Sequence, residues 1–312
     1  MRIVLLGGAG FIGTNLVISL AQDPANDITV VERKKEYFKN LESFCFANVN
    51  YAEAELSADT VFDELVRGQD IVYHLLSTTV PTTSNQHITE ELKNNVILSA
   101  NLFGACVRQN VKKVVFLSSG GTVYGKEDTC PLSEKMPTNP ITSYGVQKVT
   151  IEKLLYLYNY MYGLDYRIIR LSNPYGPFQR PNGVLGAVTT FTYKALCGDE
   201  ILVYGDGSVV RDFIYIDDAI RGILQIVNGS SNHHTFNLGS GYGTSIKTIL
   251  GKIQNVLQLN LNIRYMDARK VDVPVNYLDI RRFEHDFGNL NPVSLETGIR
   301  RTADFLKKHY NL

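Results

Sequence analysis

The sequence predicts an α/β protein with a doubly wound parallel sheet and a smaller C-terminal cap. Three observations in the 312 residues support this fold class. Short apolar runs alternate with amphipathic stretches through the first half of the chain. No hairpin turn separates consecutive apolar runs, so neighbouring strands are expected to pair in parallel through right-handed helical crossovers. The first apolar run ends in a glycine-rich turn that leads directly into a helical pattern.

Strands are expected where short, mainly apolar runs occur, because a strand inside a parallel sheet is buried on both faces. These runs lie at 2–7, 28–32, 70–76, 113–119 and 166–173. Between them apolar residues recur at helical spacing, as they do at Phe11, Leu16 and Leu20. Helices are therefore expected at 11–21, 58–67, 90–109 and 144–163.

The composition changes after residue 173. The segment 173–183 is rich in proline and glycine, which indicates an irregular loop. We expect residues 1–173 to form the main domain and residues 174–312 to form mainly the cap. Apolar segments near 213–238 are expected to return to the main domain, so that the two parts interleave.

Charge and cysteine content argue against several classes of function. Lys plus Arg and Asp plus Glu both number 31, so no net charge attracts the chain to nucleic acid or to a membrane surface. The four cysteines have no paired spacing, and no cluster of residues has metal-ligand spacing, which indicates a reducing compartment and no metal. A strand pattern begins at Arg2, which leaves no room for a signal peptide, and no apolar run is long enough to span a bilayer. We expect a soluble, cytoplasmic protein.

Three glycines after the first strand predict a dinucleotide site. Gly7 allows a tight turn, Gly10 allows a diphosphate to approach the backbone, and Gly13 allows the helix to pack closely on the strand. The amides that begin the helix favour phosphate groups. Glu32 ends the second strand, 19 residues beyond Gly13, where a carboxylate accepts hydrogen bonds from an adenosine ribose. Its charge favours NAD over NADP, although Arg33 beside it is able to accept a 2′-phosphate. Together these features predict a Rossmann domain that binds NAD.

Tyr144 and Lys148 are candidate catalytic residues. They lie four residues apart at the start of a predicted helix and therefore share one face. Free tyrosine has a pKa of about 10, and a neighbouring ammonium and an oxidised nicotinamide are both expected to lower it. Lys148 is also placed to bond the nicotinamide ribose. The strand end at 118–122 reads Ser-Ser-Gly-Gly-Thr and supplies hydroxyl groups nearby.

Five motifs occur in order along the chain: GGAGFIG, SSGGTVYG, YGVQK, RLSNPYGP and RDFIYIDD. With them the chain resembles the extended short-chain dehydrogenase/reductase family, in particular its UDP-galactose/UDP-glucose 4-epimerase branch, from residue 1 to about residue 302. The resemblance implies that Tyr144 transfers the proton and that Lys148 is its electrostatic partner. It also implies homodimers formed through the helices at 90–109 and 144–163. It adds contacts to NAD from Phe11, Ile12, Glu55, Leu56 and Asn95.

One position departs from that family. Where the family has a serine or threonine that positions the sugar oxygen and the tyrosine, this chain has Gly120. If the strand continues, Thr122 faces the same way two residues further on. We therefore predict that Thr122 takes over this role, with Ser119 as the second candidate and a bound water as a third.

The resemblance also implies a nucleotide-sugar site formed mainly by the second half of the chain. Asn173 corresponds to a residue that contacts the sugar-phosphate region, and Tyr204 to an aromatic residue against the nucleobase. Arg211 and Arg269 correspond to phosphate-binding arginines, whose forked guanidinium groups match phosphate oxygens two at a time. Asp272 corresponds to the residue at the nucleotide ribose.

Asn276 gives a finer indication of the substrate. At the corresponding position of the family, a bulky tyrosine accompanies restriction to sugars that carry no N-acetyl group. The smaller Asn276 therefore predicts room for an acetamido group, as in UDP-N-acetylglucosamine.

The predicted reaction is NAD-dependent epimerisation of a nucleotide sugar through a transient 4-keto sugar. The substrates expected are UDP-glucose and UDP-galactose or their N-acetylated forms. Dehydratases of the family carry Asp-Glu at the strand end and decarboxylases carry Glu, whereas residues 120–122 here include no carboxylate. A dehydratase, decarboxylase or reductase is the alternative enzyme, and a non-catalytic NAD-binding regulator is the alternative from another class. We interpret His74 as a core residue or one near the cofactor, and Asp217 and Asp218 as a helix N-cap.

Overall fold

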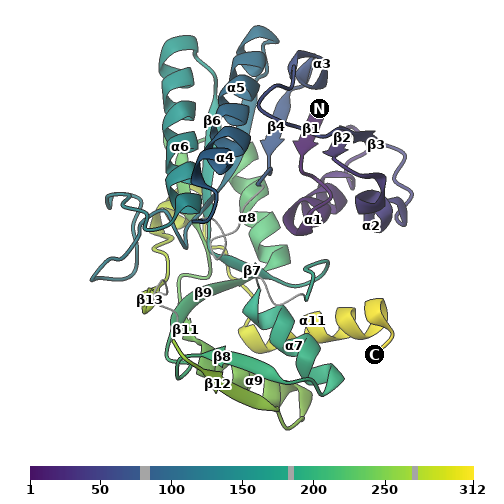
Figure 1. Ribbon diagram of the computed structural model, residues 1–312. Coiled ribbons are helices and arrows are strands. Elements are labelled where there is room, and N and C mark those ends of the chain that lie inside the picture. The colour runs from purple at the N-terminus through teal and green to yellow at the C-terminus, as the bar shows by residue number, and fades with distance from the viewer. Residues whose placement is uncertain (78–84, 182–185, 269–272) are drawn as a thin grey trace.

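Seven parallel strands form the main sheet, in the order β10-β6-β5-β4-β1-β2-β3 (Figure 1). The computed structural model describes residues 1–77, 85–181, 186–268 and 273–312. The doubly wound parallel sheet predicted from the sequence is confirmed. Strand order reverses between β1 and β4, the place where such sheets bind ligands beyond the carboxyl ends of the strands. The strands are β1 (Arg2–Leu6), β2 (Asp27–Glu32), β3 (Val49–Glu53), β4 (Ile71–His74), β5 (Lys113–Ser119), β6 (Tyr166–Leu171) and β10 (Thr235–Leu238).

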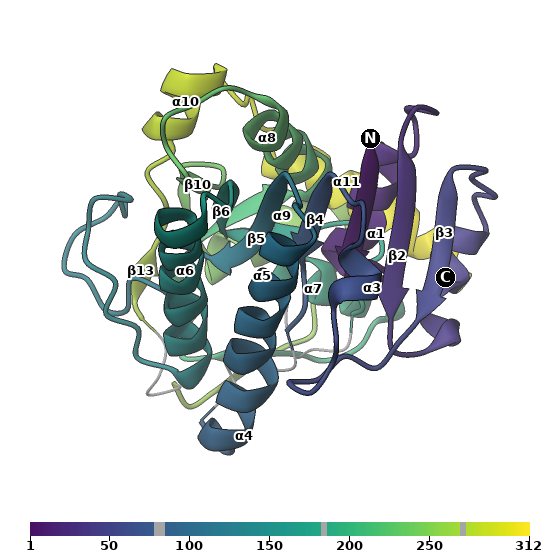
Figure 2. The same cartoon turned by 90° about the horizontal axis from the view of Figure 1, so that it is seen from above.

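The two faces of this sheet are covered by different helices. In β1, Ile3 and Leu5 belong to one hydrophobic core and Val4 and Leu6 to another, and all four are fully buried. This is why the strand is continuously apolar rather than alternating. The first face packs against helices α1 (Phe11–Leu20) and α8 (Ile216–Asn228), and the second against α5 (Leu98–Arg108) and α6 (Ser143–Tyr162) (Figure 2).

Two helices on the second face carry candidate site residues. The helix predicted at 90–109 consists of α4 (Ile88–Leu92), one π-helical turn (Lys93–Ile97) and α5. π-Helical turns are frequent at functional sites, and this one contains Asn95. The next helix, α6, begins where the Thr142 side chain accepts a hydrogen bond from the Gly145 amide at 3.2 Å.

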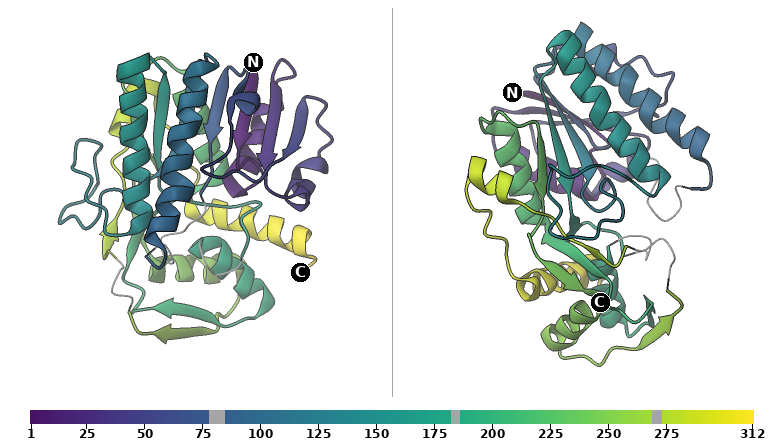
Figure 3. Two further views of the ribbon diagram at one scale, coloured as in Figure 1. Left: turned by 45° about the horizontal axis from the view of Figure 1, so that its top comes forward. Right: turned by 90° about the vertical axis from the view of Figure 1, so that its left-hand side faces the viewer.

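A smaller unit lies beyond the carboxyl ends of the main strands (Figures 1 and 3). Its four-stranded sheet contains β7 (Asn173–Tyr175), β9 (Val210–Tyr215), β11 (Gly243–Ser245) and β13 (Val275–Asn276). A two-stranded sheet pairs β8 (Ile201–Tyr204) with β12 (Ile263–Met266). The helices of this half are α7 (Ala187–Cys197), α9 (Ile246–Leu257), α10 (Arg281–Phe287) and α11 (Leu295–Tyr310).

Segments of the second half do return to the main sheet. β10 pairs with β6, and α8 packs beside α1. The residues just before α8 behave differently, because Phe213 and its neighbours belong to β9 of the smaller sheet. Only part of the segment predicted near 213–238 therefore joins the main sheet.

Two details of the predicted secondary structure are wrong. The helix expected at 58–67 is only the short α3 (Asp63–Val66), because Phe62 enters the core while Val61 is 74% exposed. The edge strand β3 was not predicted, because only Val49 among its five residues is buried and no apolar pattern results. A short α2 (Lys39–Glu42), preceded by a 3₁₀ turn (Lys35–Phe38), connects β2 to β3.

Within the described ranges, none of the helices has both the length and the apolar character that crossing a bilayer requires. The same ranges contain no cluster of three or more His, Cys, Asp or Glu side chains suited to a metal ion.

Candidate active site at the carboxyl ends of the strands

The glycine turn has the geometry that a dinucleotide site requires. Gly7 adopts a φ of +79°, a conformation that favours glycine. A Cβ atom on Gly13 would lie 2.4 Å from the Gly8 carbonyl oxygen, so only glycine lets α1 pack this closely on the turn. At Gly10 a Cβ would meet only the Gly7 carbonyl oxygen, at 3.5 Å, which leaves the start of α1 accessible. Phe11 and Ile12 follow, both half-buried, in the first turn of α1.

Glu32 lies at the end of β2, beside this turn. Burial raises the pKa of its carboxyl group. The pKa is lowered in part by hydrogen bonds from the backbone of Arg33, at 3.2 Å, and of Ala9. The positive charges of Arg33 and Arg180 act in the same direction as these bonds. Both arginine side chains lie against one ring, with their Cζ atoms 5.5 and 5.3 Å from the centroid of Tyr37. The predicted ribose acceptor therefore stands between the glycine turn and two guanidinium groups.

The residues predicted beside the adenine follow β3. The Ala54 amide donates to the Glu32 carbonyl oxygen at 2.8 Å, which holds this segment next to the end of β2. Glu55 is exposed, whereas Leu56 is half-buried and packs against the second hydrophobic core. Their contact with a nucleobase stays a prediction.

Tyr144, Lys148 and Ser119 meet at the end of β5. A side-chain hydrogen bond joins Tyr144 to Ser119. The Lys148 ammonium donates to the Leu117 carbonyl oxygen at 2.9 Å, and it lies 5.5 Å from the Tyr144 ring centroid and 4.7 Å from that of Phe116. The two predicted catalytic residues thus face the strand whose end carries the hydroxyl groups.

Burial shifts the pKa values of Tyr144 and Lys148, and the shift of Tyr144 differs from the expectation. Burial raises the pKa of the Tyr144 phenol to about 12, and the bond to Ser119 only partly opposes this. Burial also lowers the pKa of Lys148 to about 8, while Glu152 acts in the opposite direction. For the protein's own groups the pKa of the phenol is therefore raised rather than lowered, since burial of the phenol dominates.

The strand-end hydroxyls are arranged differently from the prediction. β5 ends at Ser119, and the chain then turns back so that the Val123 amide donates to the Ser119 carbonyl oxygen at 3.2 Å. The premise that the strand continues to Thr122 is therefore wrong. Its hydroxyl oxygen Oγ1 is nevertheless buried without a hydrogen-bond partner among the described residues, as are Ser172 Oγ and His74 Nδ1. Buried polar atoms are rarely left unpaired, and these three lie at the end of β4 or just after β5 and β6, at the same edge of the sheet.

A buried polar network supports the start of α6. The Glu91 carboxylate accepts hydrogen bonds from Ser143 Oγ and Gln147 Nε2, both at 3.0 Å. Gln147 Oε1 in turn accepts from Asn95 Nδ2 at 2.8 Å, which connects the predicted NAD contact to the catalytic helix. Sequence reasoning missed Glu91, Ser143 and Gln147. The available signal was the helical spacing, because Ser143 and Gln147 lie four residues apart and flank Tyr144 and Lys148.

Residues predicted to bind the sugar nucleotide border the same region. Asn173 begins β7 and its Nδ2 donates to the Asp212 carbonyl oxygen at 2.8 Å. Asn276 is almost fully buried and its Nδ2 donates to the Gly121 carbonyl oxygen at 3.3 Å, which brings β13 to the strand end of β5. Arg211 Nη1 donates to the Val273 carbonyl oxygen at 2.6 Å.

The remaining predicted substrate contacts are Tyr204, Arg269 and Asp272. Tyr204 ends β8 and is 39% exposed. Arg269 and Asp272 lie outside the described residues.

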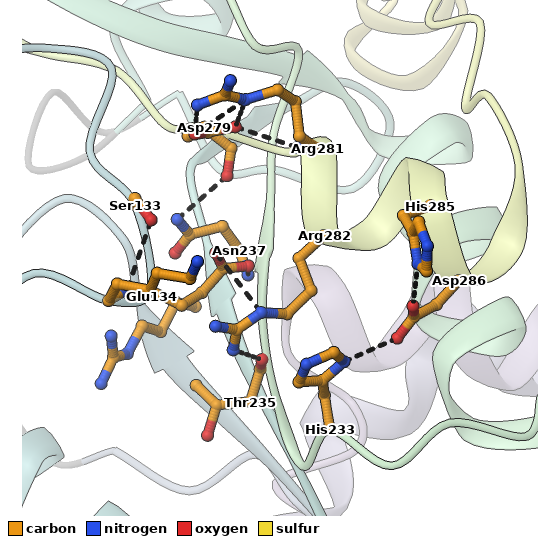
Figure 4. A network of polar contacts seen from close by, with 12 residues as sticks. Ser133, Glu134, His233, Thr235, Asn237, Asp279, Arg281, Arg282, His285 and Asp286 are labelled. Atoms are coloured by element: carbon orange, nitrogen blue, oxygen red, sulfur yellow. Dashed lines mark hydrogen bonds and ion pairs between the residues drawn. The ribbon is translucent and has the colours of Figure 1, made fainter.

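A second network fixes the loops beneath the site (Figure 4). Asn237 of β10 donates through Nδ2 to the carbonyl oxygens of Leu132 and Asp279, at 2.7 and 3.1 Å. Its own amide donates to Glu134 Oε1 at 2.9 Å, and burial raises the pKa of that carboxyl group. Arg282 Nε lies 3.7 Å from Glu134 Oε2. These bonds attach the segments around 132–134 and 278–279 to the main sheet.

The geometry agrees with what comparison to known proteins finds. A sequence model of the NAD dependent epimerase/dehydratase family matches residues 3–239. A UDP-glucose 4-epimerase of Mycolicibacterium smegmatis is 30% identical over 98% of this chain and 99% of its own. A dTDP-4-dehydro-6-deoxyglucose reductase of Escherichia coli is 30% identical over 95% of both chains.

Solved structures give the same result. The UDP-glucose 4-epimerase of Thermotoga maritima with UDP-glucose has a TM-score of 0.92 and 31% identity, and the match covers 99% of this chain and all of the other. The UDP-N-acetylglucosamine 4-epimerase of Methanobrevibacter ruminantium in complex with UDP-N-acetylmuramic acid has a TM-score of 0.90 and 29% identity, with 99% and 98% covered. The UDP-glucose 4-epimerase of Thermus thermophilus in complex with NAD has a TM-score of 0.87 and 26% identity, with 98% and 99% covered.

Proposed function

The chain belongs to the NAD dependent epimerase/dehydratase family, and from this premise we propose that it interconverts UDP-sugars that differ in configuration at carbon 4. One observation carries the proposal. Tyr144, bonded to Ser119, stands at the ligand edge of the sheet beside residues 118–122, which include no carboxylate. Elimination of water and decarboxylation in this family use such a carboxylate, whereas epimerisation needs only a group that removes a proton and returns it.

NAD is the cofactor, and the residues at its site fit it. The glycine turn leaves the start of α1 accessible to a diphosphate, and Glu32 lies at the end of β2. Bound NAD would supply the hydride chemistry at the sugar carbon, and its positive ring would favour the phenolate form of Tyr144. The proposed contacts come from Gly7, Gly10, Phe11, Ile12, Gly13, Glu32, Arg33, Glu55, Leu56, Asn95, Tyr144 and Lys148.

The protein's own groups supply position and proton transfer. Tyr144 takes the proton of the sugar 4-hydroxyl and later returns it to the oxygen of the 4-keto sugar, so no net proton is consumed. Lys148 is held by the Leu117 carbonyl at 2.9 Å, which keeps its charge beside the Tyr144 ring. That charge favours the phenolate against the burial that raises the pKa of Tyr144.

We propose that the sugar nucleotide is held by Thr122, Asn173, Tyr204, Arg211 and Asn276, together with Arg269 and Asp272 outside the described residues. The unpartnered, buried hydroxyl of Thr122 supports this, because a sugar hydroxyl would satisfy it. The short side chain of Asn276, bonded to Gly121, supports acceptance of N-acetylated sugars. A structural neighbour that is a UDP-N-acetylglucosamine 4-epimerase agrees with this.

We further propose a cytoplasmic homodimer. Several large apolar side chains of α6 are exposed, including Tyr156 (61%), Tyr160 (77%) and Met161 (57%), and the π-helical turn before α5 adds Ile97 (50%). Exposed apolar patches of this kind mark protein interfaces. All four cysteines are free, which agrees with a reducing compartment.

The test is incubation of the purified protein with a panel of nucleotide sugars, followed by NMR of the products. The panel contains UDP-glucose, UDP-N-acetylglucosamine, UDP-glucuronic acid and dTDP-glucose, and a 4-keto-6-deoxy sugar supplied with NADPH. Formation of the 4-epimer from a UDP-sugar, lost in Tyr144→Phe, supports the proposal. Formation of a 4-keto-6-deoxy or decarboxylated product, or reduction of the keto sugar alone, would replace it with one of the other enzymes. Complete rejection of the acetylated sugar would remove the inference from Asn276.

A further inference from the structure

We propose that Arg180, which belongs to the half of the chain with the proposed sugar-nucleotide contacts, is a positioning residue of the NAD site and acts through the carboxylate of Glu32. The segment 173–180, here called the strap, carries Arg180 from the smaller unit to the end of β2. The inference rests on the proposed function, because it concerns the site proposed for the adenosine ribose of NAD. Three features support it: the course of the strap, the contacts of Arg180 and the charges around Glu32.

The strap crosses from the smaller sheet to the first helix of the NAD site. It begins with β7, which pairs with β9. The Pro177 carbonyl oxygen then accepts a hydrogen bond from Asn15 Nδ2 of α1 at 3.0 Å. Asn15 is almost fully buried, and its Nδ2 also donates to the Phe11 carbonyl oxygen at 2.9 Å. The strap is therefore bonded to the helix that begins at the glycine turn.

Phe178 fixes the strap one residue further on. Its φ of +67° is unusual for a bulky residue, and such a conformation persists only where the surroundings hold it. Its ring packs edge-on against Phe305 of α11, with the centroids 4.9 Å apart, and against Phe44, which follows α2, at 6.3 Å. Arg180 is thus presented from a turn that both halves of the chain hold in place.

Arg180 reaches the region beside the ribose acceptor. Its Cζ atom lies 5.3 Å from the ring centroid of Tyr37, and that of Arg33 lies 5.5 Å from the same centroid. Arg33 also donates through Nη2 to the Tyr37 hydroxyl and through its amide to Glu32 Oε2, both at 3.2 Å. The Tyr37 ring therefore brings a guanidinium group from the second half of the chain next to the one that follows Glu32.

Glu32 needs positive neighbours to act as a ribose acceptor. An ionised carboxyl group only accepts hydrogen bonds, which suits the hydroxyl donors of a ribose, whereas a protonated one carries a donor of its own. Burial raises the pKa of the Glu32 carboxyl, while the charges of Arg33 and Arg180 and a backbone bond from Ala9 oppose this. Glu53, in register with Glu32 on β3, is exposed to solvent. Removal of Arg180 should therefore favour protonation of Glu32 and weaken its bonds to the ribose.

The first experiment measures the Kd of the full chain for NAD by calorimetric titration. Arg180→Met removes the charge and keeps an unbranched side chain, and we expect the Kd to rise by about three- to fivefold. Arg180→Lys should return it to within about twofold of the wild type. Arg301→Met is the matched control, because Arg301 Cζ likewise lies 5.6 Å from a tyrosine ring, that of Tyr215. An unchanged Kd in Arg180→Met, or an equal rise in Arg301→Met, would overturn the proposal.

Two further ligands locate the effect. ADP-ribose carries the adenosine ribose and lacks the nicotinamide, so its Kd should rise in Arg180→Met by the same factor as that of NAD. UDP should bind Arg180→Met and the wild type equally, because Pro177 and Phe178 still hold the strap. A loss for NAD alone would place the effect at the wrong end of the cofactor, and an equal loss for UDP would show that Arg180 only holds the strap; either result rejects the positioning role. Failure of UDP to bind both proteins would count against the proposed function instead.

The second experiment asks whether Arg180 acts through Glu32. In a Glu32→Gln background the ribose acceptor is neutral and no longer depends on a nearby charge. Adding Arg180→Met to this background should therefore change the Kd for NAD by less than about twofold. A rise as large as in the wild-type background would mean that Arg180 acts on the cofactor directly, and the proposed role through Glu32 would be wrong.

The third readout needs neither NAD nor a sugar. The Glu32 carboxyl group is titrated by NMR of ¹³Cδ-labelled glutamate, with its signal assigned by loss in Glu32→Gln. Because the charge of Arg180 lowers the pKa of this carboxyl group, Arg180→Met should raise the titration midpoint, whereas Arg301→Met should not. An unchanged midpoint in Arg180→Met rejects the inference. A raised midpoint in a protein that epimerises no nucleotide sugar would support the inference and reject the proposed function.

Discussion

The side-chain amide of Asn95 donates to the side-chain oxygen of Gln147 at 2.8 Å, and this bond joins the π-helical turn to the catalytic helix one residue before Lys148. Gln147 also donates to the buried Glu91 carboxylate at 3.0 Å. The residue proposed to contact NAD is therefore positioned by the same helix that carries Tyr144. The proposed cofactor contact and the proposed base thus share one support.

Replacing Gln147 tests this support. Gln147→Leu leaves Asn95 and Glu91 each without one partner in a buried site, and we expect the free energy of unfolding to fall by about 2 kcal/mol. We also expect the Kd for NAD to rise. Urea unfolding and calorimetric titration with NAD measure the two effects. Unchanged NAD affinity in a destabilised variant would mean that the network serves folding alone.

The glycine turn gives a second prediction. In Gly13→Ala the new Cβ would lie 2.4 Å from the Gly8 carbonyl oxygen, so α1 has to shift away from β1. We expect at least about a tenfold rise in the Kd for NAD, because misplacing the helix start by even a small distance removes phosphate contacts. The matched control is Gly251→Ala in α9, where a Cβ meets nothing within 4 Å. That control should keep its NAD affinity and gain about 0.5–1 kcal/mol of stability.

The buried ion pair between Arg170 of β6 and Glu152 of α6 gives a third prediction. Arg170 bonds Glu152 through Nε and Nη2 at 3.1 and 2.6 Å, and their side chains are only 8% and 5% exposed. We expect Glu152→Gln to lower the free energy of unfolding by about 3–5 kcal/mol, because it leaves a buried guanidinium without its counter-charge. The exposed pair of Arg67 and Glu64 is the control, and Glu64→Gln should cost less than about 1 kcal/mol. Equal effects of the two changes in urea unfolding would contradict this.

Lys148 gives a prediction that depends on pH. Burial lowers its pKa to about 8, below the ordinary value of 10.5. Between these values the unfolded chain binds more protons than the folded one at this group, so its destabilising effect is complete below about pH 8 and fades as pH rises toward 10.5. Lys148→Met should therefore abolish turnover and yet raise the free energy of unfolding at pH 7 by about 1–3 kcal/mol.

The measurement for Lys148→Met is urea unfolding at pH 7 and pH 10 alongside the wild type. The stability gain should be smaller at the higher pH. A gain that is the same at both values would indicate a packing effect rather than relief of a buried charge.

Short sequence patterns correctly predicted those parts of the structure that depend on residues close together in the chain. The runs that became β1, β4, β5 and β6 are mainly apolar, since both faces are covered, and the glycine turn follows from spacing alone. The edge strand β3 was missed because an edge needs few buried side chains. The helix at 58–67 was overestimated because Phe62, rather than Val61, faces the core.

The site was less predictable where distant segments meet. Ser119, Tyr144 and Lys148 were named from motifs, but the strand alternation assumed for Thr122 does not occur, because β5 ends at Ser119 and the chain reverses at the two glycines. The reason for Gly120 lies in Leu278, which reaches it from the other half of the chain. No local pattern contains that contact. The direction of the Tyr144 pKa shift also depended on burial, which only the folded chain reveals.

The pairing of β10 with β6 determines where this chain is divisible into fragments for expression. The Ile168 amide donates to the His234 carbonyl and the Ser172 amide to the Leu238 carbonyl, at 2.7 and 2.8 Å. The main sheet is therefore completed by a strand that lies, along the chain, between segments of the smaller unit. A fragment cut at residue 173 would present all of β6 as an uncovered hydrogen-bonding edge, and such edges recruit other chains into aggregates. Fragments for separate expression would have to keep β10, and because β10 runs parallel to β6, a linker between them would have to cross back over the length of the sheet.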